Sequence, residues 1–410
     1  MTFTRITEDE FIAHANRATQ RSFMQTPEMA HLLQKRGAEV EYIGYTDEKG
    51  NIQVSAVLYS LPMTGGLHME INSGPVSTDS SYLQPFYKAL QGYAKEKGAL
   101  ELLVKPYEIY QSFDNNGQPT TPEHKDMIAT LTDIGYQFDG LQTGYPEGEP
   151  NWHYVKSLEG LTEESLLNSF SKKGKPLVKK ANTFGIKIRK LTRDELSIFK
   201  EITTATSERR EYRDKSLEYY QKLYDSFGEN AEFMVATLNF QDYLTSIEKE
   251  HQQLLKKIEK LEQRPTTTKQ QNQLRELSSQ SDTFHVRKQE TQLFLEKYGN
   301  TDQLLAASLF LYTPQETTYL FSGSYPEFNK FYAPALLQEY VLKESIKRGI
   351  PSYNFLGIDG LFDGSDGVLR FKQNFNGFVV RRMGTFRYYP SPLKYKLLQG
   401  IKQVLARFRK

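Results

Sequence analysis

The order of secondary-structure patterns repeats along the chain, and this repeat constrains the fold more than any other feature of the sequence. Two alternating strands joined by a turn, an amphipathic helix and one more strand occur twice. The segments of the two copies are 39–62, 82–98 and 99–106, then 302–325, 333–349 and 350–358. In each copy the helix ends at a glycine, Gly98 or Gly349, which suits a helix C-cap. The repeat predicts two α/β domains of one type.

The predicted fold class is therefore α/β (α+β), with tandem acyltransferase-like domains of the GNAT type. At 410 residues the chain is longer than one hydrophobic core usually supports, which also favours two domains. We expect the first domain at 1–150 and the second at 151–241 plus 299–390. The last segment, 391–410, predicts a basic amphipathic C-terminal helix.

The second copy is interrupted by a coiled-coil pattern at 242–298, which follows a predicted strand. Its first half has the three-and-four spacing of an a/d seam at Leu244, Ile247, His251, Leu254, Ile258 and Leu261. Pro265 ends that helix, because proline cannot continue it, and a second polar helix follows. The pattern predicts an inserted antiparallel coiled-coil hairpin.

Positive charge is concentrated in two segments, although the net charge of the protein is only +2. Residues 171–190 hold eight Lys and Arg, residues 368–410 hold eleven, and neither segment contains an acid. A single block of this kind is usually a solvated face. Two blocks in a nearly neutral protein favour contact with a polyanion, such as the phosphates of a nucleic acid, a nucleotide or a lipid headgroup.

Several kinds of chemistry are disfavoured by missing residues and motifs. The sequence has no cysteine, no GxxxxGK[ST] phosphate loop, no HExxH motif and no GxSxG elbow. Its seven histidines are scattered, and the [QR]xxGx[GA] loop of acetyl-coenzyme A enzymes is absent. We therefore expect no metal and no cofactor. The apolar runs are too short to span a bilayer and the N-terminus lacks signal-peptide features, so we expect a cytoplasmic protein.

Two segments that combine aromatic and basic residues are candidates for a functional site. Residues 204–227 hold arginines, two lysines and several tyrosines. Arginine side chains suit the recognition of phosphate, and tyrosine hydroxyls suit the recognition of carbonyl groups. Residues 353–377 contain a strand, a glycine-rich loop and the pair Phe371-Lys372, and the carboxyl end of a strand is a common ligand position in α/β sheets. For single residues such as Tyr220 and Tyr224, core packing is the alternative explanation.

Taken together and in order, the motifs of this chain resemble the Fem family of peptidoglycan aminoacyltransferases. They are FMQTPE, SGPV at 73–76, SERREYR with EYYQKLYDSF, the hairpin, YNFLGIDG and RFKQNFNG. The resemblance covers essentially the whole chain. It implies transfer of an amino acid from aminoacyl-tRNA to the stem-peptide lysine branch of a peptidoglycan precursor, lipid II or a UDP-linked muropeptide. Overall similarity favours an alanine-adding enzyme of the MurN type, with serine or glycine as alternatives, that works before or after a related aminoacyltransferase.

The resemblance also implies roles for individual residues. The Phe-Lys pair of the family's FKxxF motif corresponds to Phe371 and Lys372, which we expect to be catalytic. Substrate binding is expected from eight residues: Arg213, Lys215, Tyr219, Tyr220, Lys35, Arg36, Tyr107 and Phe375. Donor tRNA is expected at four lysines of the first basic block: Lys172, Lys173, Lys179 and Lys180.

Two other functions remain open on the sequence. A non-catalytic RNA-binding or scaffold protein would also use a coiled coil and basic faces, and an acyl-coenzyme A dependent N-acyltransferase would share the fold. The hairpin is either a platform for tRNA or a rigid spacer, and the sequence favours both roles equally. The tail at 391–410 either packs on the protein or makes peripheral contact with the inner leaflet of the membrane, where lipid II lies.

Overall fold

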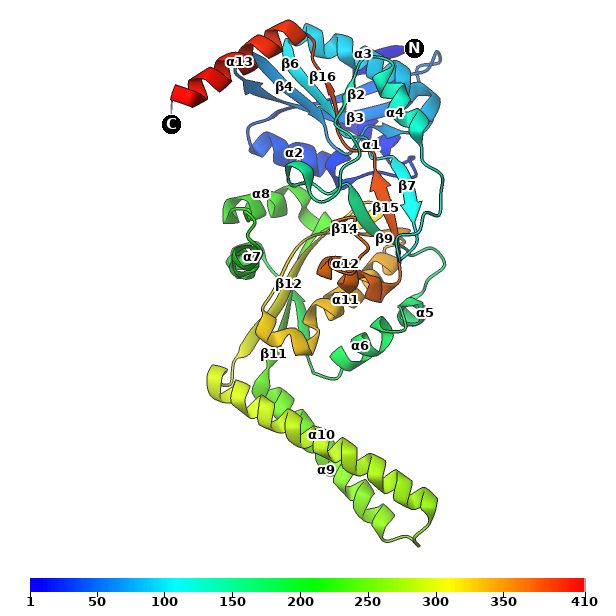
Figure 1. Cartoon of the computed structure of the whole chain (residues 1–410), viewed down its shortest axis with the longest axis vertical. Helices are drawn as coiled ribbons and strands as arrows, with labels where there is room; N and C mark the ends of the chain where they lie inside the picture. Colours follow the sequence, from blue (N-terminus) through cyan, green and yellow to red (C-terminus); the bar gives the residue numbers. More distant parts are fainter. Residues whose placement is uncertain (409–410) are drawn as a thin grey trace.

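The computed structural model describes residues 1–408 and contains two eight-stranded sheets with helices packed on them (Figure 1). The first sheet has the order β1-β2-β3-β4-β6-β16-β8, with β5 paired to β3. Its strands are β1 (Thr2–Arg5), β2 (Glu39–Thr46), β3 (Ile52–Met63), β4 (Gly66–Ile71), β5 (Val76–Ser77), β6 (Ala99–Val104), β8 (Gln137–Phe138) and β16 (Phe386–Tyr388). Its helices are α1 (Glu8–Ala15), α2 (Pro27–Lys35), α3 (Leu83–Glu96) and α4 (Lys125–Thr132).

The second sheet has the order β10-β11-β12-β13-β14-β9-β15-β7. Its strands are β7 (Ile109–Phe113), β9 (Trp152–Ser157), β10 (Lys187–Lys190), β11 (Ala231–Asn239), β12 (Asp302–Tyr312), β13 (Glu316–Ser324), β14 (Ser352–Ile358) and β15 (Phe378–Arg382). Its helices are α5 (Glu163–Leu166), α6 (Gly174–Ala181), α7 (Leu196–Arg210), α8 (Leu217–Phe227), α11 (Ala333–Lys347) and α12 (Gly367–Lys372).

The two sheets have the same local topology. Each contains one parallel pair among its described strands, β4 with β6 and β13 with β14, and each pair is connected through a helix, α3 or α11. The helices form because their apolar residues lie on one side: Phe86, Tyr87 and Leu90 of α3 are fully buried, as are Leu337 and Val341 of α11. The tandem acyltransferase-like fold that the sequence repeat predicts is confirmed.

The two sheets exchange strands across the predicted domain limits. Strand β7 lies within 1–150 but pairs with β15 at the edge of the second sheet. Strand β16 lies within 299–390 but pairs with β6 and β8 in the first sheet. Each sheet therefore includes one strand from the other half of the chain, and the segment that follows β6 passes directly from one domain to the other.

Helices α9 (Phe240–Glu262) and α10 (Thr268–Tyr298) form the long hairpin that projects from the second domain (Figure 1). The residues buried in α9 include Leu244, Ile247 and Leu254 of the predicted seam. His251 on the same seam is buried, and its Nε2 lies 2.8 Å from Oγ of Ser281 on the opposite helix. These contacts hold the two helices side by side over their middle part.

The C-terminal helix α13 (Pro392–Phe408) lies at the end of the first domain, far from the hairpin (Figure 1). The predicted helix at 391–410 includes Arg409 and Lys410, which lie outside the described residues. Within residues 1–408, no helix is both long enough and apolar enough to cross a bilayer.

Candidate active site

Near its carboxyl end, β14 contains a bulge at which its pairing with β9 is interrupted and then resumes at Gly357 and Ile358. The pairing register between the two strands shifts between Asn354 and Gly357. At this shift Leu356 has a φ of 56°, in the left-handed region that is unfavourable for a leucine. Its backbone N–H donates to Oδ1 of Asn354 at 2.8 Å, which holds the bulge in place. The bulge places the carbonyls of Leu356 and Gly357 within hydrogen-bond distance of α12.

Lys372, the residue predicted to be catalytic, ends α12 beneath this bulge. Asp366 caps α12 by accepting from the backbone N–H groups of Val368 and Leu369, at 2.7 and 3.0 Å. The Lys372 side chain is only 3% exposed, and its Nζ donates to the carbonyls of Leu356 at 3.0 Å and Gly357 at 2.5 Å. Burial lowers the pKa of Lys372 to about 7, although Asp366 opposes this shift. The ammonium is therefore tied to the bulge, and its charge is sensitive to pH near neutrality.

The two phenylalanines of the same motif have different environments. Phe375 is fully buried, and its ring packs edge-on against Phe170 with 5.2 Å between centroids. Phe371 is only partly buried and lies edge-on to Phe375, with 5.5 Å between centroids. Phe375 therefore belongs to the core that supports Lys372, whereas Phe371 retains an accessible face.

Tyr107 takes part in a buried polar network that joins the two domains. Its hydroxyl donates to Oε1 of Glu316 at 2.5 Å and accepts from Nδ2 of Asn354 at 3.1 Å. The guanidinium of Arg382 lies over the Tyr107 ring, 3.7 Å from its centroid, and donates to the Tyr107 carbonyl. Burial raises the pKa of Glu316, and Arg382 opposes the shift. Asn354 bonds both to this network and to the backbone of the bulge, so its hydrogen bonds connect the domain junction to the Lys372 site.

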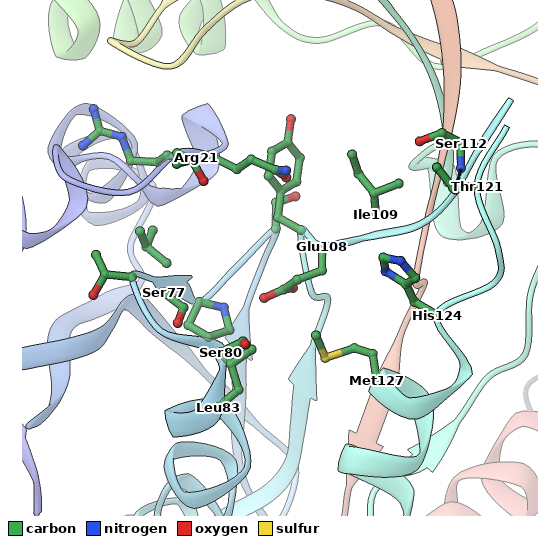
Figure 2. A pocket seen from close by; sticks show the side chains of 17 residues that line it. Arg21, Ser77, Ser80, Leu83, Glu108, Ile109, Ser112, Thr121, His124 and Met127 are labelled. Carbon is green, nitrogen blue, oxygen red and sulfur yellow. Dashed lines mark hydrogen bonds between the residues drawn. The ribbon is translucent and has the colours of Figure 1, made fainter. Parts of the chain in front are cut away.

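A cavity of about 400 Å³ lies next to Tyr107 in the first domain. It is bounded by the loop after α1, the segment before α3, the connection from β6 to β7 and the start of α4. Figure 2 shows the Glu108 side chain directed into it, toward Ser77 and Ser80. Burial raises the pKa of Glu108, and its Oε2 has no hydrogen-bond partner in the described part of the chain. The sequence analysis did not identify this cavity.

The structure brings together three of the predicted substrate-binding residues from distant parts of the sequence. Arg36 follows α2, and its guanidinium lies 5.4 Å from the centroid of the Tyr219 ring on α8. Nζ of Lys215 lies 5.5 Å from the same ring. Both cations are exposed, and Lys35 is exposed beside them. Arg36, Lys215 and Tyr219 thus form a cationic clamp, the name used below for these three residues.

Two other predicted substrate-binding residues lie next to the clamp in different environments. Tyr220 is fully buried, and its hydroxyl donates to Oδ1 of Asp214 at 2.7 Å. Asp214 also accepts from Nζ of Lys200 at 2.6 Å, so Tyr220 helps to fix the segment before α8. Arg213 is exposed on this segment.

Near the clamp, a charged network occupies the parallel pair of the first sheet. His68 contacts Oε1 of Glu101 at 2.8 Å and Oε2 of Glu70 at 3.1 Å, and these hydrogen bonds raise its pKa to about 9 against the effect of burial. Lys105 pairs with Glu70 at 3.0 Å and with Glu149 at 2.8 Å. The contact between His68 and Glu70 could have been predicted from the sequence, because residues two positions apart on a strand such as β4 share a face of the sheet.

The first basic block divides into two parts with different surroundings. Lys187, Arg189 and Lys190 pair with Asp242, Glu195 and Glu229 at 3.3, 2.9 and 3.8 Å. The four predicted tRNA-binding lysines, Lys172, Lys173, Lys179 and Lys180, are exposed and form no ion pair within residues 1–408. Unpaired charge is therefore concentrated on and just before α6.

Helix α6 packs directly on the motif that contains Lys372. The carbonyl of Asn374, in the 3₁₀ helix η8 (Gln373–Phe375), accepts from the Ser171 backbone N–H at 3.0 Å. Gly174 lies so close to the same carbonyl that the structure leaves no room for a Cβ. The unpaired lysines are therefore held at a fixed position relative to the Lys372 site.

We expect Gly174→Ala to destabilise the protein by about 1–3 kcal/mol, because the added methyl group must push α6 away from Asn374. Gly92→Ala is the matched control, since Gly92 lies inside α3 with open space around its Cβ position. This control should be stabilising by about 1 kcal/mol through helix propensity. Urea unfolding of both variants measures the difference, and equal free energies of unfolding would contradict the close packing.

Comparisons with known proteins find similarity over nearly the whole chain. The FemAB family model matches residues 6–403. Aminoacyltransferase FemA of Staphylococcus epidermidis is 26% identical over 416 residues, covering 98% of this chain and 100% of that protein. FemA of Staphylococcus aureus is 26% identical over 419 residues, covering 99% and 100%.

Solved structures share the fold. A crystal structure of FemX has a TM-score of 0.76 at 21% identity and covers 97% of this chain and 99% of that one. A tandem GNAT protein from the clavulanic acid biosynthesis pathway has a TM-score of 0.50 at 9% identity, covering 95% and 99%. With a family model that matches nearly the full length, the chain belongs to the FemAB family.

Proposed function

We propose that this protein transfers an amino acid from an aminoacyl-tRNA to the stem-peptide amine of a peptidoglycan precursor, as part of interpeptide bridge formation. Membership of the FemAB family and relatives named aminoacyltransferases support this reaction. The observation that carries it is that the segment with the unpaired lysines of α6 packs on the Lys372 motif, while the clamp forms a second cationic surface where α2 ends and α8 begins. Two polyanionic substrates, one of them an RNA, would need such an arrangement.

The proposed chemistry is aminolysis of an ester. The amine nitrogen of the acceptor attacks the ester carbonyl carbon, the bond to the ribose oxygen breaks, and the proton lost by the amine ends on the released hydroxyl. The donor ester is already activated, so positioning the amine against the carbonyl supplies much of the acceleration. Lys372 would stabilise the negative charge that develops on the carbonyl oxygen, either directly or through the bulge that it holds.

The donor would bind along α6. The four unpaired lysines on and just before α6 would contact the phosphates of the acceptor stem, and the packing of Gly174 on η8 would direct the end of the tRNA toward Phe371 and Lys372. The accessible face of Phe371 suits stacking on a terminal base. The helical hairpin would then be a second contact for the body of the tRNA or a spacer.

The acceptor would bind at the clamp. Precursors linked to a lipid or to UDP carry a pyrophosphate, and Arg36 and Lys215 offer two cations close to the Tyr219 ring. From there the stem peptide would extend along the domain junction toward the β14 bulge. We propose alanine as the transferred residue, with serine and glycine as the alternatives.

The function is tested by incubating the protein with tRNA charged with alanine, serine or glycine and with either lipid II or a UDP-linked pentapeptide. We expect the acceptor mass to rise by one residue with one of the three. Binding of tRNA without any product would favour the non-catalytic RNA-binding alternative. Acylation from acetyl-coenzyme A in place of tRNA would favour the N-acyltransferase alternative.

For the clamp, we expect Arg36→Ala/Lys215→Ala to raise the KM for the acceptor about 10²-fold or more, because charged hydrogen bonds to phosphate contribute about 1.5–3 kcal/mol each. The kcat should change little, since these contacts are equally strong in the ground and transition states. Lys222→Ala, on α8 but paired with Glu218 at 2.8 Å, is the control. A fall in kcat with an unchanged KM would remove the clamp from acceptor binding.

A further inference from the structure

Helix α13 exposes a row of large apolar side chains. Leu393, Leu397 and Ile401 are 83%, 65% and 47% exposed, and their spacing of four places them on one face of the helix. A neighbouring side of the helix is anchored, because Leu398 packs closely against Gly65 at the tip of the β3–β4 hairpin. Leu61 on β3 of that hairpin is also exposed, at 38%. Three exposed aliphatic residues on one helix face are unusual for a surface that meets only water.

The surroundings of this face are positively charged. Lys394 and Lys396 are exposed on α13 and form no ion pair among the described residues. The sequence contains no Asp or Glu from 368 to the end. A second copy of α13 would therefore bring cations against cations, which disfavours self-association through this face. An anionic partner with an apolar interior fits both features.

The position of α13 in the molecule is compatible with a planar partner. The helix lies at one end of the long axis, and the α9–α10 hairpin projects from the other end (Figure 1). A surface that contacts this end of the molecule would leave the hairpin at the far end from it. A large donor could then approach the second domain without steric conflict.

We propose that the exposed face of α13, together with Leu61, docks on a lipid bilayer that contains anionic lipids. The apolar side chains would enter the interface between headgroups and acyl chains, and Lys394 and Lys396 would contact the headgroups. The benefit of this contact rests on the proposed function, because a lipid-linked acceptor is confined to such a surface. The contact itself is independent of catalysis and can be measured without either substrate.

The test measures co-sedimentation of the full-length protein with vesicles of phosphatidylcholine containing phosphatidylglycerol. We expect binding that weakens with salt and is lost on pure phosphatidylcholine. Leu393→Glu/Leu397→Glu should weaken binding at least about tenfold, through lost apolar contact and added negative charge. The control Val286→Glu/Leu293→Glu adds the same charge at two residues of the hairpin that are 55% and 65% exposed, and it should bind like the wild type.

Equal vesicle binding by the wild type and the Leu393→Glu/Leu397→Glu variant would overturn the proposal. So would a dimer in solution that this variant dissociates, because the face would then be an interface between copies. On substrates, the variant should lose turnover of lipid II in vesicles and keep turnover of the UDP-linked acceptor. If the wild type binds vesicles but turns over neither acceptor, the proposed function fails and the docking surface stands.

Discussion

Replacing Lys372 by methionine should lower turnover by about 10²-fold or more while the protein stays folded. Methionine keeps the length and the apolar stem of the side chain, but it cannot donate to the carbonyls of Leu356 and Gly357 and carries no charge. Loss of one preorganised electrostatic contact to a developing oxyanion typically has an effect of this size. Single-turnover kinetics with charged tRNA measure it, and near-normal turnover would remove Lys372 from the mechanism.

Lys156→Met is the matched control for removing a buried cation. Lys156 is also buried in the second domain, burial lowers its pKa to about 8, and its Nζ donates to the Asn376 carbonyl at 3.2 Å. We expect Lys156→Met to lose far less turnover than Lys372→Met. Comparable losses in both variants would indicate that the effect comes from repacking of the domain and not from the position of Lys372.

The depressed pKa of Lys372 also predicts a pH dependence. Its proton is lost as pH rises through about 7, so the part of kcat that depends on the cation should decline above that pH. Lys372→Met should lack this decline. In the unfolded chain the lysine stays protonated up to about 10.5, so burial of Lys372 costs most stability below pH 7 and progressively less toward pH 10.5. The stability advantage of the methionine variant should shrink over the same interval.

The features that could be predicted from the sequence are those with a local signal. The repeated strands and helices have hydrophobic periodicities that need no knowledge of distant residues, and Gly98 and Gly349 mark the ends of two helices. The first helix of the hairpin follows for the same reason, since Leu244, Ile247 and Leu254 repeat at three and four positions and are buried. The placement of Lys372 close to the carboxyl end of β14 follows from the short glycine-rich loop that connects β14 to α12.

The features that could not be predicted depend on pairing between distant segments. Strand β16 has three residues and β7 has five, too few for a pattern that would assign either one to the opposite sheet. The hydrogen bond from Tyr107 to Glu316 joins residues 209 positions apart. Because that hydroxyl is already bonded inside a buried network, Tyr107 supports the junction of the domains, which its sequence context does not indicate.

The first basic block illustrates the same limit in electrostatic terms. Its sequence contains no acid, so all eight cations look equivalent. In the fold, carboxylates from α9, from the residue just before α7 and from the turn before β11 reach three of them, and this leaves the charge near α6 uncompensated. Only the three-dimensional structure distinguishes the paired cations from the unpaired ones.

This distinction leads to a quantitative prediction for donor binding. Neutralising Lys172, Lys173, Lys179 and Lys180 together to glutamine should lower tRNA affinity by about 10²-fold at physiological salt. The slope of log K against log salt should become shallower by about three, because each lost phosphate contact contributes about 0.7–0.9. Filter-binding titrations over a range of salt concentrations give both values.

The paired cations of the same block provide the matched control for this experiment. Lys187→Gln/Arg189→Gln/Lys190→Gln removes nearly as much formal charge, but each of these residues already pairs with a carboxylate at 3.3, 2.9 or 3.8 Å. Because these carboxylates hold the three cations and reduce their local potential, this variant should leave the salt slope almost unchanged. If the two variants flatten the slope equally, the donor senses only the overall charge of the domain, and α6 is a solvated face. If only the first variant does so, the four unpaired lysines on and just before α6, next to the Lys372 motif, are the surface that binds the RNA.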